Sequence, residues 1–565
     1  MDKVLFLFLR RMRAPLLVLI TAYSVSIAGL VLIPGIDDQG EPWRMDFFHA
    51  FYFVSYMATT IGFGEIPHAF SEGQRMWTAA TIYISVIAWL YAIGKILTLI
   101  QDPTFKLAVS QQAFDRSIRR LRAPFFIVCG YGDTGSLLVR SLLRRRKRVV
   151  VIDHSQERIN DLALSAMDFH IPALCADASN SARLQSAGLS NPFCQGVVAL
   201  TDHDEINLKI AITVKLLNPD LPVICRAESR DTERNMRSFG TDQVINPFAI
   251  FGERLALALH SPGHHLLHQW LSSVPGNDLP MPIYPPHGTW ILCGFGRFGK
   301  AAHSGLHREG VTTVIVEEDP ERAGCAGECI RGRGTEADTL QEAGVVTAAG
   351  IVAGTDSDSN NLSILMTAHE LNPELFMVAR QNRDDNGALF EAGHPHLVVR
   401  HSEIVAETVL AQLTSPLLPR FLAEAQNRDE AWVNELLSRV SAVTDERVPA
   451  VWSVELTPNT APAWLERRRH EPLSLGQIMM HPVHRDQQIQ CVALLLQRAT
   501  GGEILLTPGD DTSLDPGDRI LFSGQPTAIA RLLRVLRNAH VLDFLLTGTD
   551  RPQGWLWRRF GSRSA

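Results

Sequence analysis

Two glycine-rich segments of the sequence have the spacing of a turn that binds a phosphate group. Each follows an apolar run, 125–129 in the first case and 290–293 in the second, and each precedes a helical pattern. The glycines permit a tight turn and a close approach of the backbone to a pyrophosphate, and the helix N-terminus supplies amide donors and a favourable dipole. The residues of the two turns are Gly130, Tyr131, Gly132, Asp133, Thr134 and Gly135, and Gly294, Phe295, Gly296, Arg297, Phe298 and Gly299. We therefore predict two nucleotide-binding sites.

An acidic residue ends the apolar run that follows each turn. These residues are Asp153 in the first copy and Glu317 in the second. Such a carboxylate accepts hydrogen bonds from ribose hydroxyls and disfavours a 2′-phosphate, so NAD(H) or an adenine nucleotide is the expected ligand. A further shared pattern, T-D-x-D-x-x-N, begins at Thr201 and again at Thr355. Because the same features return in the same order, the sequence predicts two doubly wound α/β domains. Each domain either binds a nucleotide or keeps the nucleotide-binding fold only as a scaffold.

A third segment, near the N-terminus, is uncharged and has glycines at alternate positions. It consists of Thr60, Ile61, Gly62, Phe63 and Gly64. Alternating glycines allow backbone conformations that turn successive carbonyls toward one axis. Four such segments around an axis, together with the Thr hydroxyls, would replace the hydration shell of a K⁺ ion. The segment therefore predicts an ion-selective filter built from four chains.

Apolar elements flank this segment on both sides. The first uncharged run, 14–36, is long enough to cross a hydrocarbon core of about 30 Å, and a second run covers 76–94. Acidic residues prevail between the two runs, whereas both ends are basic, so the positive-inside rule places both termini in the cytosol. The apolar segment 47–58 predicts a short helix that leads into 60–64 from inside the membrane.

Composition limits the remaining possibilities. The 565 residues are enough for several domains, and 46 % hydrophobic with 20 % charged residues excludes global disorder. A net charge of −7 argues against a nucleic-acid partner. Because the mean hydropathy is only +0.03, a membrane-spanning part must be a minority of the chain. The eight cysteines show no paired C-x-x-C spacing and suit a reducing cytosol better than a disulfide framework.

Placed between two spans and behind a short helix, the segment 60–64 resembles the selectivity filter of the two-transmembrane potassium channels. Ile61 and Phe63 stand where that family usually has Val and Tyr, and Glu65 replaces the usual Asp. The longer Glu65 leaves the strictness of potassium selectivity open. In many relatives a glycine lets the inner helix bend, but the matching position here is Ile84, which leaves the position of the gate open. A re-entrant loop that conducts no ions is the alternative.

The glycine-rich repeats resemble the regulator-of-potassium-conductance (RCK, or TrkA-N) domain, a Rossmann-type gating module of bacterial potassium channels and transport systems. The resemblance implies that Asp177 and Ala178 belong to the first nucleotide site. Arg333 stands at the place of Asp177 in the second copy, which suggests that this site favours a more anionic ligand such as ADP, ATP or AMP. The resemblance further implies that the amphipathic segments 250–259 and 402–413 form intersubunit or interdomain helix pairs.

Metal sites are expected to be absent. Calcium-gated relatives carry a carboxylate set whose matching positions here are Thr201, Arg226 and Glu228, and only one of these is acidic. The acidic residues at 202–205 are expected to be a solvated loop rather than a divalent-ion site. Four histidines follow the first Rossmann pattern, and a polar linker face is expected in preference to a metal site. They are His260, His264, His265 and His268.

The predicted fold class is an all-α membrane pore domain with two spans, then two α/β Rossmann-like RCK domains with doubly wound parallel sheets, and a small β-rich C-terminal lobe. The expected boundaries are 1–100 for the pore domain, 101–123 for a linker, 124–286 for the first RCK domain, 287–440 for the second Rossmann subdomain, 441–540 for the lobe and 541–565 for a tail.

These features together predict a homotetrameric, ligand-gated K⁺ channel of the plasma (inner) membrane, without enzyme activity. Two RCK domains per chain would supply a complete cytosolic gating ring, which NAD(H) or an adenine nucleotide would regulate. The alternatives are a membrane-tethered NAD-dependent oxidoreductase and a poorly selective regulatory subunit of a potassium uptake system. The identity of the ligand, the sign of its effect and any regulation by a divalent ion stay open.

Overall fold

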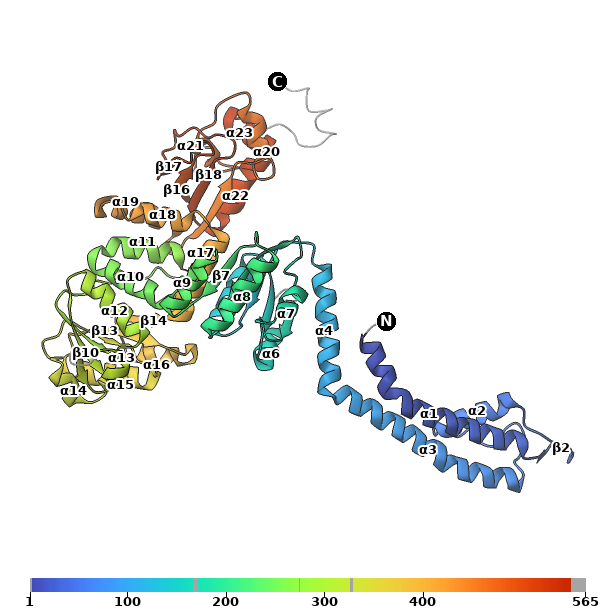
Figure 1. Cartoon of the computed structure of the whole chain (residues 1–565). Helices are drawn as coiled ribbons and strands as arrows, with labels where there is room; N and C mark the ends of the chain where they lie inside the picture. Colours follow the sequence, from blue (N-terminus) through green and yellow to red (C-terminus); the bar gives the residue numbers. More distant parts are fainter. Residues whose placement is uncertain (1–2, 166–170, 274, 326–328, 550–565) are drawn as a thin grey trace, which may run out of the picture. The chain divides into compact units, whose positions relative to one another are not determined.

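The computed structural model describes residues 3–165, 171–273, 275–325 and 329–549 (Figure 1). Its internal contacts separate a first unit, Met1–Leu121, from a second, Arg122–Ala565. The first unit is helical apart from a two-stranded ribbon, and the second contains two six-stranded parallel sheets and a four-stranded antiparallel sheet. The predicted fold class is therefore confirmed.

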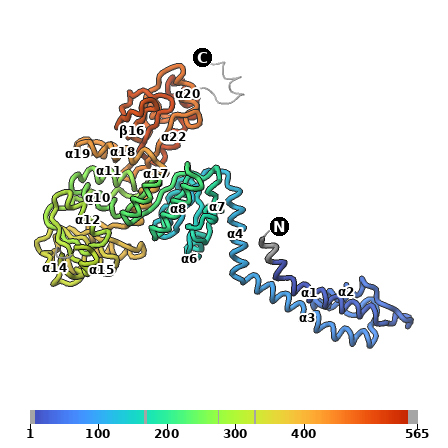
Figure 2. The backbone as a smooth tube through the Cα atoms, viewed as in Figure 1, coloured from blue at the N-terminus to red at the C-terminus, as the bar shows by residue number. Residues whose placement is uncertain are grey.

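Two helices of the first unit, α1 (Lys3–Leu32) and α3 (Glu72–Gln101), are long and apolar enough to cross a membrane. They run side by side (Figure 2), and a Cβ atom at Gly29 of α1 would lie 2.0 Å from the indole ring of Trp77 in α3. The Trp77 indole N–H also donates to the carbonyl of Ser26 over 3.1 Å. The lack of a side chain at Gly29 therefore lets the two helices approach closely.

The first helix ends earlier than the apolar run that predicted it. Helix α1 stops at Leu32, so residues 33–36 of the predicted span lie outside it. Pro34 disfavours helical backbone at the residue before it, which explains this end. The chain then forms β1 (Gly35–Ile36), which pairs with β2 (Pro42–Trp43) in an antiparallel ribbon.

The short helix predicted at 47–58 is confirmed as α2 (Phe47–Ala58). It begins where the Asp46 carboxylate accepts the His49 amide over 2.7 Å, a normal N-terminal cap. Helix α3 begins at a capping box and passes both Ile84 and Gly94 without a break. Pro103–Arg120 then form the polar helix α4 within the predicted linker.

The first parallel sheet has the strand order β5-β4-β3-β6-β7-β8, and a helix connects each strand to the next in sequence. The order reverses beside β3, the topological switch point where ligands bind in doubly wound sheets. The strands are β3 (Phe125–Cys129), β4 (Arg148–Asp153), β5 (Ala173–Cys175), β6 (Cys194–Ala199), β7 (Val223–Arg226) and β8 (Gln243–Ile245), and the helices are α5 (Asp133–Arg144), α6 (Gln156–Leu164), α7 (Ser181–Ser186), α8 (Asp204–Leu217) and α9 (Arg230–Ser238).

The second parallel sheet repeats this order as β11-β10-β9-β12-β13-β14. Its strands are β9 (Thr289–Cys293), β10 (Thr312–Glu317), β11 (Cys329–Arg331), β12 (Gly350–Ala353), β13 (Phe376–Gln381) and β14 (Leu397–Arg400), and its helices are α12 (Arg297–Arg308), α13 (Pro320–Ala323), α14 (Ala337–Glu342), α15 (Asp358–Leu371), η1 (Asp384–Asn386) and α16 (Gly387–Ala392). The glycine-rich turns follow β3 and β9, the central strands of the two sheets.

The two Rossmann units exchange the helices that follow their last strands. Helix α10 (Pro247–His260), which ends the first unit, packs on α12 of the second, where Phe251 and Leu255 share a core with Trp290. Helix α17 (His401–Thr414), which ends the second unit, packs on α5 of the first. The interdomain pairing implied for segments 250–259 and 402–413 therefore occurs within one chain.

The C-terminal lobe is an antiparallel sheet of order β15-β18-β16-β17 with helices around it. Its elements are β15 (Ala450–Glu455), α20 (Pro462–Arg468), α21 (Leu475–Ile478), β16 (Cys491–Gln497), β17 (Ile504–Leu506), β18 (Arg519–Gly524), α22 (Pro526–Arg537) and α23 (Ala539–Thr547). Helices α11 (Pro262–Ser272), α18 (Leu418–Ala425) and α19 (Glu430–Thr444) pack against the sheet and one another.

Three predicted boundaries differ from this arrangement. The boundary at 440 falls inside α19, and the boundary at 540 falls inside α23, whose Leu542 and Leu545 are buried in the core of the lobe. Helix α11, expected within the first RCK domain, shares a core with strands of the lobe through Leu267 and Leu271. The expected boundaries followed changes in composition, whereas these helices belong where their apolar faces pack.

Of the four histidines after the first Rossmann unit, His260 is exposed, as a polar face requires, but the three in α11 are not part of such a face. His264 and His265 of α11 are buried, and His265 and His268 line a cavity of about 180 Å³ together with Arg254 and Glu407. Burial is the main cause that lowers the pKa of His265 to about 4 and raises that of Glu407 to about 7. Within the described residues, no group of three or more potential metal ligands occurs.

Candidate functional site

The filter segment leaves α2 with left-handed backbone at alternate residues. The φ angles of Thr60, Gly62 and Gly64 are 62°, 68° and 101°, so one of the three positions carries a side chain in a region that favours glycine. Ile61 and Phe63 are 60 % and 65 % exposed within the single chain. The Tyr56 hydroxyl donates to the Gly64 carbonyl. The segment is thus tied to α2 at its last residue, and its two large side chains are exposed in the single chain.

Glu65, which follows this segment, is anchored by α3. The Nε of Arg75 lies 2.8 Å from Oε1 of Glu65, and the Phe70 amide donates to Oε2 over 2.9 Å. A second guanidinium nitrogen of Arg75 donates to Oε2 over 3.0 Å, and this bidentate contact holds Glu65 against the first turn of α3. The sequence showed that Glu65 is unusual, but it did not indicate Arg75 as its partner, because the two residues are not related by a regular repeat.

The first glycine-rich turn is close-packed against the sheet. Gly130 has φ of 101°, and a Cβ atom there would lie 2.9 Å from the backbone of Leu200. A Cβ atom at Gly135 would lie 2.0 Å from the Gly130 carbonyl oxygen, so this position requires glycine. A Cβ atom at Gly132 would meet a guanidinium nitrogen of Arg158 at 3.3 Å. Gly132 is partly exposed, and Arg158 borders the space in front of it, which is called the first cleft below.

The second turn has the same backbone conformation as the first, but its middle glycine has more open surroundings. Gly294 has φ of 93°, and a Cβ atom at Gly299 would lie 2.0 Å from the Gly294 carbonyl oxygen. A Cβ atom at Gly296 would meet nothing within 4 Å. Both turns lead directly into helices of 12 residues, α5 and α12. Since the glycines leave room for a pyrophosphate at a helix N-terminus, the residues of both turns fit a nucleotide.

Four of the predicted nucleotide-binding side chains belong to the protein core instead. Tyr131, Thr134, Phe295 and Phe298 are 5 %, 3 %, 8 % and 1 % exposed. Phe298 stacks on Phe251 of the exchanged helix α10, with ring centroids 4.6 Å apart. These residues can therefore contribute to a nucleotide site only through their backbones, a distinction that motif spacing does not make.

The two acids at the strand ends organise their own turns. Asp153 accepts the Tyr131 amide over 2.6 Å and the Ser155 amide over 2.8 Å. Glu317 accepts the Phe295 amide in the same way. Asp153 is itself only 3 % exposed, whereas Glu317 is partly exposed. The observed role of both acids is to hold the backbone of their turns, and the ribose-binding role stays a prediction.

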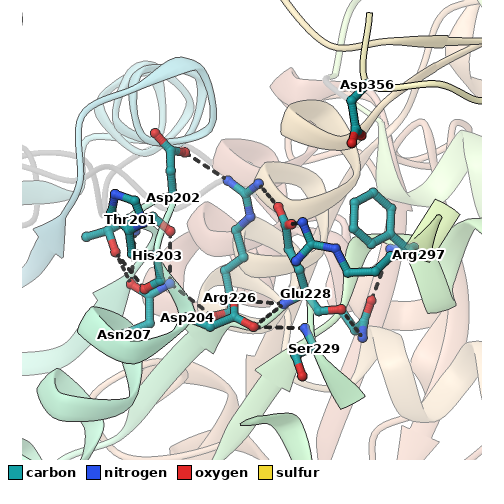
Figure 3. Close-up of polar contacts among 12 residues, drawn as sticks. Thr201, Asp202, His203, Asp204, Asn207, Arg226, Glu228, Ser229, Arg297 and Asp356 are labelled. Carbon is teal, nitrogen blue, oxygen red and sulfur yellow. Dashed lines mark hydrogen bonds and ion pairs between the residues drawn. The ribbon is translucent and has the colours of Figure 1, made fainter. Parts of the chain in front are cut away.

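The pattern T-D-x-D-x-x-N clamps the loops at the strand ends (Figure 3). The Asn207 amide accepts from Thr201 Oγ1 over 2.7 Å and donates to the carbonyls of Thr201 and Arg226. Asp204 accepts the amides of Glu228 and Ser229. In the second copy Asn361 bonds Thr355 and Arg380 in the same manner. The pattern therefore joins neighbouring strands, and Asp204 is engaged as a cap.

Of the residues that match the calcium site of calcium-gated relatives, two instead belong to an ion-pair network, which links the two Rossmann units (Figure 3). Arg226 is buried and pairs with Glu228 and, over 3.4 Å, with Asp202. The second oxygen of Glu228 lies 2.7 Å from the guanidinium of Arg297, which belongs to the second glycine-rich turn. Arg297 also lies 5.6 Å over the ring of Phe248. A residue of one nucleotide turn is thus tied to the opposite unit.

The matching contact of the first turn has the opposite electrostatic character. Asp133 stands where Arg297 stands in the second turn, and Asp384 and Asp385 of the second unit face it. Burial, followed by these two carboxylates, raises the pKa of Asp133. One turn is therefore held across the interface by an ion pair, whereas the other meets two carboxylates together with a backbone hydrogen bond from Asp384.

Asp177 and Arg333 occupy equivalent positions, as the sequence predicted. The strand pairs Asp153–Cys175 and Glu317–Arg331 are in the same register, so the two residues follow their strands at the same distance. Asp177 caps Ser179, and the guanidinium of Arg333 lies 2.7 Å from Glu318. The buried Ala178 lies beside Asp177. Since Glu318 balances its charge, Arg333 offers an anionic ligand less attraction than its sequence position suggested.

Family models match three segments of the chain. Residues 16–102 match the ion channel model, and residues 126–247 and 290–400 each match the TrkA-N domain model. Potassium channel protein 1 of Methanocaldococcus jannaschii is 26 % identical over 223 residues, which cover 39 % of this chain and 64 % of the relative. The voltage-gated potassium channel Kch of Escherichia coli is 23 % identical over 211 residues, which cover 37 % and 49 %. The aligned segments thus span less than two thirds of these relatives.

Solved structures to which the chain is similar include the GsuK channel, with 17 % identity, a TM-score of 0.47 and coverage of 97 % of this chain and all of that one. The GsuK channel bound to NAD has 17 % identity and a TM-score of 0.46, with 94 % and 99 % covered. The chain therefore combines an ion-channel segment, which holds its two membrane-length helices, with two TrkA-N domains.

Proposed function

We propose that this protein is a potassium channel gated by nucleotides, assembled from four identical chains in the cell membrane with both termini in the cytosol. The observation that carries the proposal is the segment 60–64. It follows a short apolar helix between two membrane-length helices, it alternates left-handed residues, and its side chains are exposed in the single chain. Four such segments facing one axis would coordinate a dehydrated K⁺ ion with carbonyl oxygens.

The two glycine-rich clefts are the proposed regulatory sites, with NAD(H) or an adenine nucleotide as the ligand. In each, a pyrophosphate would lie against the open middle glycine, Gly132 or Gly296, and the acid at the next strand end would receive a ribose hydroxyl. Arg158 borders the first cleft, and Arg297 begins the helix at the second. A ligand at the second cleft competes with Glu228 for Arg297, which gives it a route to alter the contact between the two Rossmann units.

Transmission to the pore follows the chain itself. Only residues 121–124 separate helix α4 from strand β3 of the first Rossmann unit. A nucleotide shifts the gate by the difference between its affinities for the two arrangements of the Rossmann units, and by no more than that. Because α10 and α17 each end one unit and pack on the other, a change at either cleft acts on both units.

The proposal is tested with the purified full-length protein in liposomes. We expect K⁺ flux that exceeds Na⁺ flux and that changes when ADP or NAD is added, and native mass spectrometry should give four chains. Absence of K⁺ flux under every nucleotide tested, or NADH turnover without flux, would refute the channel and favour a tethered oxidoreductase. Flux that does not distinguish K⁺ from Na⁺ would favour the poorly selective subunit.

Variants of the open glycines separate regulation from conduction. Gly132→Asp places a carboxylate where the pyrophosphate of the first cleft would lie, and Gly296→Asp does so in the second. Each variant should retain basal flux and lose one of the two nucleotide responses. A nucleotide response that persists in the double variant would contradict the assignment of the clefts.

A further inference from the structure

Two cysteines meet beside the second glycine-rich turn. Cys325 follows helix α13, and Cys329 is the first residue of strand β11. Their sulfur atoms are 2.7 Å apart, and the Cys329 thiol also approaches the Cys325 carbonyl at 3.0 Å. A disulfide bond measures about 2.05 Å, so bond formation needs a movement of well under 1 Å.

This pair is particular to the second copy. Ala173 occupies in β5 the register position that Cys329 occupies in β11, opposite Val151 and Ile315 respectively. Among the residues that the structure describes, no other two cysteine sulfurs lie within hydrogen-bonding distance. The Rossmann fold itself therefore does not require the pair, since the first copy is built without it.

The two thiols differ in access. Cys325 is 3 % exposed and packs with Phe295 and Ile315, whereas Cys329 is partly exposed. Burial is the main cause that raises the pKa of Cys325 to about 12. Because the thiolate is the nucleophile in thiol–disulfide exchange, Cys329 is the residue that reacts first with a reagent from solution.

We infer that Cys325 and Cys329 are a redox modification site, at which a low-molecular-weight disulfide oxidises the pair to an intramolecular disulfide. The Cys329 thiolate attacks one sulfur of the small disulfide, which forms a mixed disulfide and releases one thiolate. The Cys325 sulfur then attacks Cys329 Sγ and releases the second thiolate. The protons lost by the two cysteines end on the two released thiols, so one small disulfide becomes two small thiols.

The modification acts on the second nucleotide cleft through residues already described. Cys325 contacts Phe295, whose amide donates to Glu317, and Cys329 lies opposite Ile315 in the strand that Glu317 ends. A bond between the two sulfurs ties Cys325 to the first residue of β11 beside this turn. The effect on nucleotide affinity rests on the proposed function, whereas the bond itself does not.

The bond is tested on the purified full-length protein. Trypsin releases both cysteines in one peptide, residues 323–331, because Arg322 and Arg331 flank it. After exposure to glutathione disulfide and then alkylation, this peptide should carry no alkyl group and weigh two hydrogens less than the reduced, unalkylated peptide. Treatment with dithiothreitol before alkylation should restore the doubly alkylated peptide. Cys325→Ser and Cys329→Ser should lose this product, and Cys175→Ser, which removes a partly exposed cysteine of the first copy, should retain it.

Each other outcome overturns the inference. A peptide that stays fully alkylated, or that carries glutathione on Cys329 without the internal bond, would show that the two thiols do not join. A separate arm measures ADP affinity in the Gly132→Asp background, where only the second cleft responds. We expect the oxidised and reduced forms to differ by about fivefold, the low end of measured coupling between sites. Equal affinities would refute the regulatory effect, and absence of ADP binding in both forms would count against the proposed function while the peptide result still decides the bond.

Discussion

The ion pair between Glu228 and Arg297 gives a prediction whose sign follows from the competition described above. If a pyrophosphate at the second cleft must take Arg297 from Glu228, then Glu228→Gln should strengthen nucleotide binding. The Glu228 side chain is 15 % exposed and that of Arg297 is 59 % exposed, so the pair is closer to a surface ion pair than to a buried one. Such pairs contribute about 0.5–1 kcal/mol, which corresponds to about two- to fivefold tighter binding.

The assay is calorimetric titration of the full-length protein with ADP in the Gly132→Asp background, so that only the second cleft is observed. Arg297→Gln should weaken binding, and adding Glu228→Gln to that variant should give no further gain, because the competing pair is already absent. Glu471→Gln serves as a matched control, since this carboxylate pairs with Arg467 in the C-terminal lobe. Unchanged or weaker binding in Glu228→Gln would refute the competition.

Three further predictions concern stability and assembly. Burial lowers the pKa of His265 from 6.5 to about 4, so the folded state disfavours the charged form of this histidine. The free energy of unfolding should therefore fall by about 3 kcal/mol as the pH falls from 6.5 to 4. In urea unfolding, His265→Gln should lose less stability over that range, and a pH profile identical to that of the unaltered protein would contradict this. Arg146 has φ of 57°, and Gly310, the matching residue of the second copy, has φ of 71°. Arg146→Gly should therefore stabilise the folded protein by about 1 kcal/mol, and Gly310→Arg should destabilise it. Urea midpoints that move in the opposite directions would show that the backbone argument is wrong. Gly29→Ala should disrupt the packing of α1 on α3 and reduce the yield of tetramer in detergent. Gly94→Ala should leave the yield unchanged, because a Cβ atom there meets nothing within 4 Å. Equal yields from the two variants would refute the role of Gly29.

Much of this architecture could be predicted from the sequence because it repeats or because its periodicity is strong. The membrane-length helices follow from apolar runs, and the duplicated turns at Gly130 and Gly294 follow from glycine spacing between strand patterns. The short helix at 47–58 was predicted with its observed bounds. In each case, the interactions that determine the element lie within a short stretch of chain.

The contacts that could not be predicted join residues distant in the sequence. Nothing near Glu228 indicates Arg297, and nothing near His265 indicates that α11 packs beneath the lobe. Motif spacing identified Phe298 as a site residue because it marks position, but it does not show that the ring packs into the core. Exposure and partner depend on tertiary packing, which a local pattern does not encode.

The exchange of α10 and α17 has a consequence for how the molecule can be divided. Cutting the chain between the two sheets, near residue 286, would give two pieces that each retain a complete sheet but carry the other's covering helix. Each piece alone would expose the apolar side of its own sheet to water. Neither half should fold stably when expressed by itself, whereas co-expression should restore the fold of both.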